Sequence, residues 1–287
     1  FIGSCTLDRG GSRTMHAGML ARLVLWWSSV SYSSSLRTAS SSSLTVQSPQ
    51  ESPFRVAMVG DSLTFGNGTL SFDGRGPYEI LSNPALSRRG SLPLEFQQLL
   101  KKRFAGRKRV ELRVFARNGI AAMSRVHHHS RGCSKANATN TTSCSFRDSP
   151  EFAAARNFCH RSDLTLVMLG TNDAKNEPSV LQDHFGESLQ EVIKALQPTR
   201  TSGLLVVMDP PDNKKPQTYL PESMHVVHQQ TARVAKALGI LHVPLGRTIS
   251  VEEGKFFTDG VHFTPLACSH GAQAILNAVS PYLPTVS

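Results

Sequence analysis

Three short polar segments, far apart in the chain, carry the residues whose types and spacing could do chemistry. Gly60-Asp61-Ser62 follows an apolar run, Asn172-Asp173 follows another, and Asp259 stands three residues before His262 near the end of the chain. Each segment alone has an ordinary explanation, since these residue types are common in turns and helix caps. Their combination predicts a serine nucleophile served by a base and an orienting carboxylate.

An activated serine explains why these side chains would occur together. A serine hydroxyl becomes a strong nucleophile when a base within hydrogen-bond reach takes its proton, and histidine suits this role near neutral pH. We expect His262 to be the base for Ser62, and Asp259 to hold the imidazole in the required tautomer.

Acyl transfer by a serine also needs hydrogen-bond donors for the oxyanion that forms on attack. The candidates are the backbone N–H of Ser62, the side-chain amide of Asn172 and the N–H of Gly119. Gly119 has no side chain to obstruct approach, although an Asn-Gly pair is also an ordinary turn. Asp61 and Asp173, beside two of these residues, are expected to support the site.

Five apolar segments are expected to form the parallel strands that place these residues. Their aliphatic and β-branched content, and the absence of strict alternation in residues 166–169 and 204–207, indicate burial on both faces, and segments with helical spacing lie between them. Such an alternation predicts an α/β sheet with helices on both faces and a ligand site beyond the carboxyl ends of the strands, where Ser62 lies. The predicted strands are residues 55–59, 110–115, 164–169, 204–208 and 240–243, and the predicted helices are 92–103, 185–196, 222–238 and 266–279.

These blocks resemble those of the SGNH hydrolases, also called the GDSL lipase and esterase family, from about Arg55 to Tyr282. Four separated blocks of that family supply Ser, Gly, Asn and His, which match Ser62, Gly119, Asn172 and His262 here. The resemblance implies a flavodoxin-like three-layer αβα sandwich with a five-stranded parallel sheet of order 2-1-3-4-5. It also implies hydrolysis of carboxylic esters through an acyl-enzyme, without a metal or another cofactor.

One feature of the sequence points to a branch of this family, and another departs from the family pattern. Residues 169–175 and 259–262 are similar to the single-domain acylhydrolase and carbohydrate-esterase branch. In the second block, family members often carry Asn two residues before the glycine and another Gly three residues after it. Those positions are Arg117 and Ala122 in this chain.

The substrate is less constrained than the reaction. A domain without a long apolar lid favours short acyl groups, such as acetyl esters on carbohydrate. A lysophospholipase or thioesterase that acts on longer acyl chains is the alternative enzyme. A non-catalytic carbohydrate-binding module on the same scaffold is the alternative of another class, but the presence of all four block residues argues against it.

The chain is basic, with a formal charge of +10 and 287 residues. Part of this charge is concentrated in one basic cluster after residue 100, which could face nucleic acid, anionic lipid or an acidic polysaccharide. No interleaved aromatic residues accompany it, so a solvated surface is favoured and no nucleic-acid partner is expected. The densest patch comprises Lys101, Lys102, Arg103, Arg107, Lys108, Arg109 and Arg113.

Residues 1–50 are predicted to be a leader that precedes a domain of residues 51–287. A basic start at Arg22 precedes the apolar run 23–27, which is too short to span a membrane, and a serine-rich tract follows. The same composition suits a secretory signal or an organelle transit peptide. We expect a monomeric protein of the secretory pathway, with the mitochondrion or plastid as the alternative.

Four cysteines remain outside the leader, so two disulfides could form: Cys133, Cys144, Cys159 and Cys268. The pair Cys133–Cys144 is the first candidate because it brackets glycosylation sequons at Asn137 and Asn140. A cystine-closed, glycan-bearing segment suits an oxidising compartment. The alternative is chance sequons and free thiols.

The polar region of about residues 124–150 is predicted to be a surface insertion near the substrate entrance. It contains the triplet His127-His128-His129. Consecutive histidines do not converge on one ion unless the fold bends them, so a solvated loop is favoured over a metal site.

Overall fold

The structure is a computed structural model that describes residues 52–66, 78–79, 90–123, 145–199, 201, 203–212, 219–249 and 255–285. All of these residues belong to the unit Pro49–Ser287. The predicted leader, the sequons at Asn137 and Asn140, the pair Cys133–Cys144 and the histidine triplet lie outside the described residues and stay predictions.

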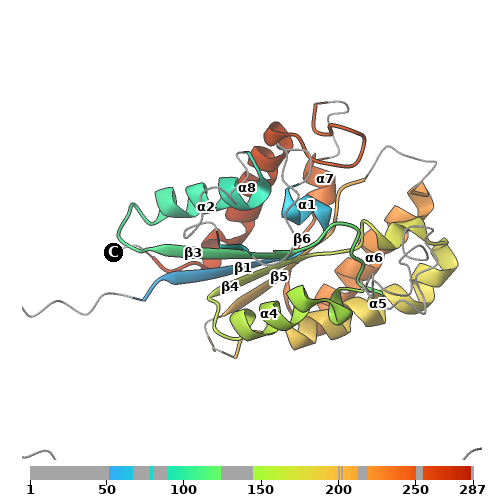
Figure 1. Cartoon of the computed structure of the whole chain (residues 1–287), viewed down its shortest axis with the longest axis horizontal. Helices are drawn as coiled ribbons and strands as arrows, with labels where there is room; N and C mark the ends of the chain where they lie inside the picture. The colour runs from blue at the N-terminus through green and yellow to red at the C-terminus, as the bar shows by residue number, and fades with distance from the viewer. Residues whose placement is uncertain are drawn as a thin grey trace, which may run out of the picture. The chain divides into compact units, whose positions relative to one another are not determined.

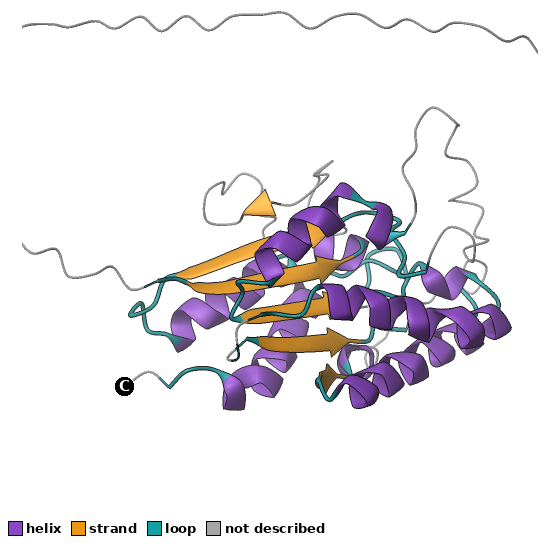
Figure 2. Cartoon of the chain, turned by 90° about the horizontal axis from the view of Figure 1, so that it is seen from below, coloured by secondary structure: helices purple, strands orange, loops and turns teal. Residues whose placement is uncertain are grey.

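A twisted six-stranded sheet forms the centre of this unit (Figures 1 and 2). Its order is β2-β3-β1-β4-β5-β6, and all neighbours are parallel except β2, which pairs antiparallel with β3. Val59 on β1 pairs with Phe115 on β3 and Val167 on β4, so the strand that precedes Ser62 is central. The strands are β1 (Phe54–Gly60), β2 (Tyr78–Glu79), β3 (Val110–Ala116), β4 (Leu164–Met168), β5 (Leu204–Met208) and β6 (Leu241–Val243).

Helices cover both faces of the sheet (Figure 1). One face carries α2 (Leu92–Arg103), α7 (Leu245–Ile249) and α8 (Pro265–Val279), and the other carries α4 (Pro150–Cys159), α5 (Pro178–Ala195) and α6 (Pro221–Leu238). A one-turn helix, α1 (Ser62–Phe65), follows β1 directly. No helix in the described part of the chain is long and apolar enough to cross a bilayer.

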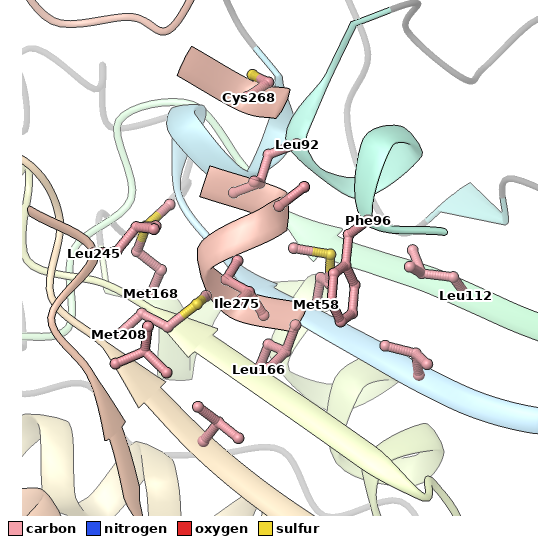
Figure 3. Close-up of a cluster of buried hydrophobic side chains, with 14 of the residues drawn as sticks. Met58, Leu92, Phe96, Leu112, Leu166, Met168, Met208, Leu245, Cys268 and Ile275 are labelled. Carbon is pink, nitrogen blue, oxygen red and sulfur yellow. The ribbon is translucent and has the colours of Figure 1, made fainter. Parts of the chain in front are cut away.

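Side chains alternate along β1 and fill two separate cores. Val56 and Met58 belong to the core under α2 and α8, where Phe96 and Ile275 pack (Figure 3). Val59 belongs to the core on the opposite face. Because both faces are buried, each large apolar side chain contributes about 1.5–3 kcal/mol, and the strand is held rigidly between the two layers.

The predicted sheet is confirmed. The five parallel strands have the order 2-1-3-4-5 when they are numbered along the chain, and each predicted strand boundary lies within one residue of the observed one. The short antiparallel β2 is an addition at the edge. Its two residues are too few to produce a periodic signal.

Two helical features differ from the prediction. Helix α5 begins at Pro178 and not at residue 185, because Leu181 extends the apolar stripe by one turn and proline suits the first helical position. Helix α4 is absent from the prediction. Its start is capped by Ser149, whose Oγ accepts the N–H of Phe152 at 3.2 Å.

The final residues of the predicted surface insertion pack into the domain. Phe146 is fully buried, and its N–H donates to the carbonyl of Ala121 at 2.8 Å, just after β3. Pro150 is already the first residue of α4. This end of the segment is therefore anchored beside the loop that carries Gly119, while residues 124–144 lie outside the described part.

Cys159 and Cys268 are free thiols, so the two do not form a second disulfide. Each is fully buried, Cys159 in the core on the α4 face and Cys268 in the core on the α8 face. The sheet separates them. Burial raises the pKa of each thiol to about 12.

Candidate active site

A close approach of backbones positions Ser62 at the carboxyl end of β1. A Cβ on Gly60 would lie 2.6 Å from the carbonyl oxygen of Met168 on β4, so the strand can end here only with glycine. Asp61 then caps α1, and its Oδ1 accepts the N–H of Leu63 at 2.9 Å. Ser62 is the first residue of α1, so its own N–H has no acceptor within the helix.

A tightly closed loop before α8 positions His262. Thr258 donates to the carbonyl of His262 from both its N–H, at 2.8 Å, and its Oγ1, at 3.2 Å. Gly260 adopts a φ of +84°, which favours glycine and turns the chain between Asp259 and His262. Thr264 caps α8 and fastens the loop to the helix, since its Oγ1 accepts the N–H of Ala267 at 3.3 Å.

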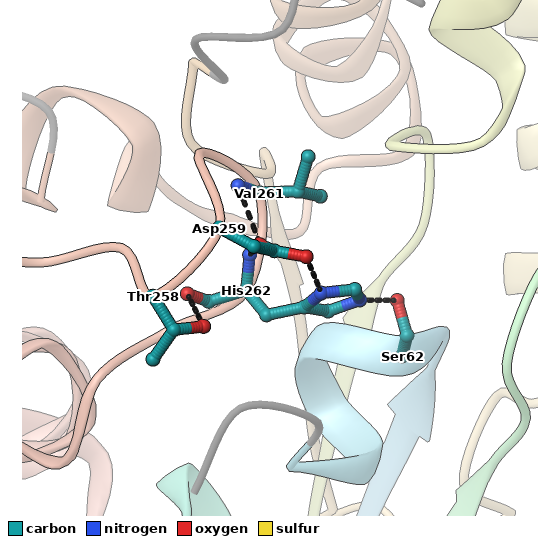
Figure 4. A network of polar contacts seen from close by, with 5 residues as sticks. All are labelled: Ser62, Thr258, Asp259, Val261 and His262. Carbon is teal, nitrogen blue, oxygen red and sulfur yellow. Dashed lines mark hydrogen bonds and ion pairs between the residues drawn. The ribbon is translucent and has the colours of Figure 1, made fainter.

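A chain of hydrogen bonds joins Ser62, His262 and Asp259 (Figure 4). The Nε2 of His262 lies 3.2 Å from the Oγ of Ser62, and its Nδ1 lies 2.9 Å from the Oδ2 of Asp259. Ser62 is only 6% exposed. Two residues separated by 200 positions in sequence therefore meet with the geometry expected of nucleophile and base.

The carboxylate of Asp259 is held in its ionised form. Desolvation alone would raise its pKa, but the N–H groups of His262 and Val261 both donate to Oδ1, at 2.8 and 3.0 Å, and the imidazole contacts Oδ2. These contacts bring the pKa of Asp259 well below its ordinary value. An ionised carboxylate on Nδ1 leaves Nε2 as the nitrogen that faces Ser62.

Asn172 lies buried at the carboxyl end of β4, next to β1. Its Nδ2 donates to the carbonyl of Ile120 at 2.9 Å, and its Oδ1 accepts from the Nζ of Lys175 at 2.8 Å. The neighbouring Asp173 accepts the N–H groups of Ala122 and Met123, each at 2.9 Å. The loop after β4 is thus tied to the loop after β3.

Gly119 lies exposed in that second loop and has a φ of +75°. A Cβ there would meet nothing within 4 Å, so the backbone conformation and not a lack of space calls for glycine. The N–H of Arg117 donates to the carbonyl of Gly60 at 3.3 Å, which starts the loop beside the Ser62 turn. Ser62, Gly119 and Asn172 therefore follow three adjacent strands at one edge of the sheet.

Arg117, two residues before Gly119, pairs with the buried Glu151 of α4 at 3.8 Å. The guanidinium therefore joins the end of β3 to the first turn of α4. Such a link holds the start of the Gly119 loop from the α4 side.

Asp61 is fully buried directly before Ser62. The N–H of Leu63 and the hydroxyl of Thr171 are the hydrogen-bonding groups beside its buried carboxyl. Burial raises the pKa of Asp61 to about 6, and the hydrogen bonds from the N–H of Leu63 and the hydroxyl of Thr171 oppose that rise only in part. The Asp173 carboxylate raises the pKa further, whereas the His262 ring lowers it.

Lys175 is a part of the site that the sequence pattern does not single out. It lies three residues after Asn172 in the 3₁₀ turn Asp173–Lys175, a spacing that brings the two side chains together. Its Nζ also lies 5.3 Å from the centre of the Tyr219 ring. The described residues contain no cluster of three or more His, Cys, Asp or Glu side chains that could hold a metal ion.

A family model described as the GDSL-like Lipase/Acylhydrolase family matches residues 58–267. No curated protein sequence matches the chain. Among solved structures, a protein assigned as an arylesterase from Agrobacterium tumefaciens aligns with a TM-score of 0.52 and 18% identity, over 80% of this chain and 99% of the other. A carbohydrate acetylesterase family member from Sinorhizobium meliloti has a TM-score of 0.50 and 16% identity, over 80% and 98%. The lipase/acylhydrolase from Enterococcus faecalis has a TM-score of 0.50 and 14% identity, over 80% and 97%.

Proposed function

Because the chain belongs to the GDSL-like lipase/acylhydrolase family and is a carboxylic ester hydrolase of the SGNH type, we propose that it cleaves short-chain esters with Ser62 as nucleophile. The observation that carries this proposal is the hydrogen-bond chain from Ser62 through His262 to Asp259. It supplies a nucleophile, a base and an orienting carboxylate in contact.

The first half of the reaction forms an acyl-enzyme. The Nε2 of His262 takes the proton of Ser62 as Oγ attacks the ester carbon, and Asp259 stabilises the imidazolium that results. His262 then returns the proton to the leaving alcohol as the carbon–oxygen bond breaks. In the second half, His262 takes a proton from a water molecule as that water attacks the acyl carbon. It then returns the proton to the Oγ of Ser62 as the bond between the acyl carbon and Oγ breaks and the acid leaves.

The oxyanion of each tetrahedral intermediate needs donors at the same edge of the sheet. The N–H groups of Ser62 and Gly119 and the Nδ2 of Asn172 are the proposed donors. Each is worth about 3 kcal/mol of transition-state stabilisation in sites of this kind.

A short acyl group, acetyl above all, is the proposed substrate feature. A long acyl chain needs a broad apolar surface, whereas Leu266 and Tyr282 are the large apolar side chains exposed in the described part of the domain. The structural neighbours named above include an arylesterase and a carbohydrate acetylesterase, and we extend the proposal to acetylated carbohydrate on that likeness of fold.

The test is a series of nitrophenyl esters of increasing acyl length, together with acetylated oligosaccharides. We expect kcat/KM to be highest for acetyl and to fall with chain length. Rates that rise with chain length would instead favour a lysophospholipase or thioesterase.

The nucleophile is tested in the same assay with Ser62→Ala. This change should lower kcat by about 10⁴-fold or more, since the triad members act as one unit. Ser269→Ala, an exposed serine on α8, is the matched control and should retain full activity. Near-normal turnover by Ser62→Ala would remove the mechanism whatever the preferred ester.

A further inference from the structure

The orientation of the Asn172 carboxamide is fixed from both ends. Its Nδ2 donates to the carbonyl of Ile120, and its Oδ1 accepts from the Nζ of Lys175. An ammonium group can only donate and a carbonyl oxygen can only accept. If the amide turned over, two donors would face each other at Lys175 and two acceptors would face each other at Ile120.

Lys175 itself is held in place. It ends the 3₁₀ turn that begins directly after Asn172, its side chain is partly buried, and its Nζ lies over the Tyr219 ring. Tyr219 is 7% exposed. The lysine therefore reaches Asn172 from a packed position and does not behave as a solvated surface cation.

The charge of Lys175 also matters, because two buried carboxylates lie near the site. Asp61 and Asp173 are both fully buried, and both interact electrostatically with the Lys175 ammonium. Negative charge at these positions opposes the formation of an oxyanion close by. Burial lowers the pKa of Lys175, and the two carboxylates counteract part of that effect.

We propose that Lys175 is a positioning residue for ester hydrolysis, which turns the Nδ2 of Asn172 toward the oxyanion and offsets the charge of Asp61 and Asp173. The inference rests on the proposed function, since it assumes that Asn172 is an oxyanion donor. Lys175 does not touch the substrate in this account. It acts through the carboxamide that it orients and polarises.

The first test replaces Lys175 by methionine, which keeps the length of the side chain and removes its charge and its hydrogen bond. We expect kcat on nitrophenyl acetate to fall by about 10- to 100-fold, less than the loss of an oxyanion donor, with KM nearly unchanged. Lys194→Met, at an exposed position near the end of α5, is the matched control and should leave both constants unchanged.

A double-mutant cycle with Asn172→Ala separates positioning from a structural role. If Lys175 acts through Asn172, Lys175→Met will have little further effect on kcat once the amide is gone. The phosphonylation rate of Ser62 by a fluorophosphonate should follow the same pattern, because its phosphoryl oxygen occupies the oxyanion position. The proposal would be overturned if the loss of kcat in the double variant equalled the product of the losses in the two single variants. An unchanged kcat in Lys175→Met would overturn it as well.

Two further variants keep the test decisive if the methionine variant does not fold. Lys175→Arg keeps a cationic donor and should retain most of the rate, whereas Lys175→Gln keeps a donor without the charge and should be intermediate. Equal activity of the glutamine and wild-type proteins would exclude the charge effect. If Ser62→Ala kept its activity, the proposed function would fail. If Ser62→Ala were inactive but the Lys175 variants had the wild-type kcat, only the inference about Lys175 would fail.

Discussion

At the scale of single residues, the carboxyl of Asp61 makes the stability of the fold depend on pH. Its pKa is raised by burial to about 6, above the value near 4 in an unfolded chain, so the folded state binds this proton more tightly. The stabilisation from the protonated carboxyl is complete below about pH 4 and is lost as pH rises through about 6. At neutral pH the buried carboxylate costs about 3 kcal/mol.

Asp61→Asn is therefore expected to stabilise the protein at pH 8 by up to about 3 kcal/mol, with no gain near pH 4. Asparagine remains a good helix cap, and its amide can keep a hydrogen bond with the hydroxyl of Thr171, which contacts the Asp61 carboxyl. The measurement is the free energy of unfolding in denaturant for both proteins across this pH range. Asp61→Ala, which loses the cap as well, is the comparison. The expectation would be contradicted if the free energies of unfolding of Asp61→Asn and wild type differed by the same amount at every pH.

The chemical types of the site residues and the pairing of Ser62 with His262 could be predicted, but the contacts of Lys175 could not. Ser62, His262 and Asp259 stand in turns after apolar segments, and their side-chain types suffice to suggest a nucleophile, a base and an orienting acid. Lys175 has no such signature. Its role depends on which way an amide faces, and that follows from the position of the Ile120 carbonyl in a different loop.

At the scale of elements, Asp173 joins the loop after β4 to the loop after β3. Its carboxylate accepts the N–H groups of Ala122 and Met123, and the same loop begins beside Gly60 and carries Gly119. Asp173→Asn would place an amide N–H against one of these donors. We expect a loss of about 2–3 kcal/mol in the free energy of unfolding.

The same substitution should also lower kcat, because the loop that carries Gly119 would lose its hydrogen bonds to the loop that carries Asn172. Unfolding in denaturant and the kinetics on nitrophenyl acetate measure the two effects. Asp183→Asn, an exposed position on α5, is the control and should change neither. If Asp173→Asn were as stable and active as this control, the link between the loops would have no energetic importance.

Helices and strands could be predicted where their burial produces a clear pattern of apolar residues in the sequence. Strands β1, β4 and β5 are largely buried on both faces and appear as mainly apolar runs with recognisable ends, whereas Glu111 and Arg113 interrupt the apolar residues of β3. Helix α4 was not predicted because its buried apolar stripe is narrow and follows a polar region; the stripe consists of Ala155, Phe158 and Cys159. Its cap at Ser149 and proline at 150 were the available signals.

At the scale of the whole molecule, the sheet divides the interior into two cores. Each core contains one of the free cysteines, Cys159 or Cys268, and no disulfide joins these two residues. Cys268 packs with α2 and α8, while Cys159 packs with α4 and α5. The even number of cysteines outside residues 1–50 is thus compatible with a disulfide only between Cys133 and Cys144, which stays a prediction. A bridge there would tie together the predicted insertion and not the core.

Thiol labelling of the full chain, followed by peptide mass mapping, should distinguish these cysteines. In native protein Cys159 and Cys268 should react with a maleimide only as fast as the core opens, because burial holds them as neutral thiols. Ser269→Cys places an exposed thiol beside Cys268 on α8 and should react at once. Cys133 and Cys144 should be labelled only after denaturation with reductant. Rapid native labelling of Cys159 or Cys268 would contradict the two-core packing, and labelling of Cys133 and Cys144 without reductant would remove the predicted bridge.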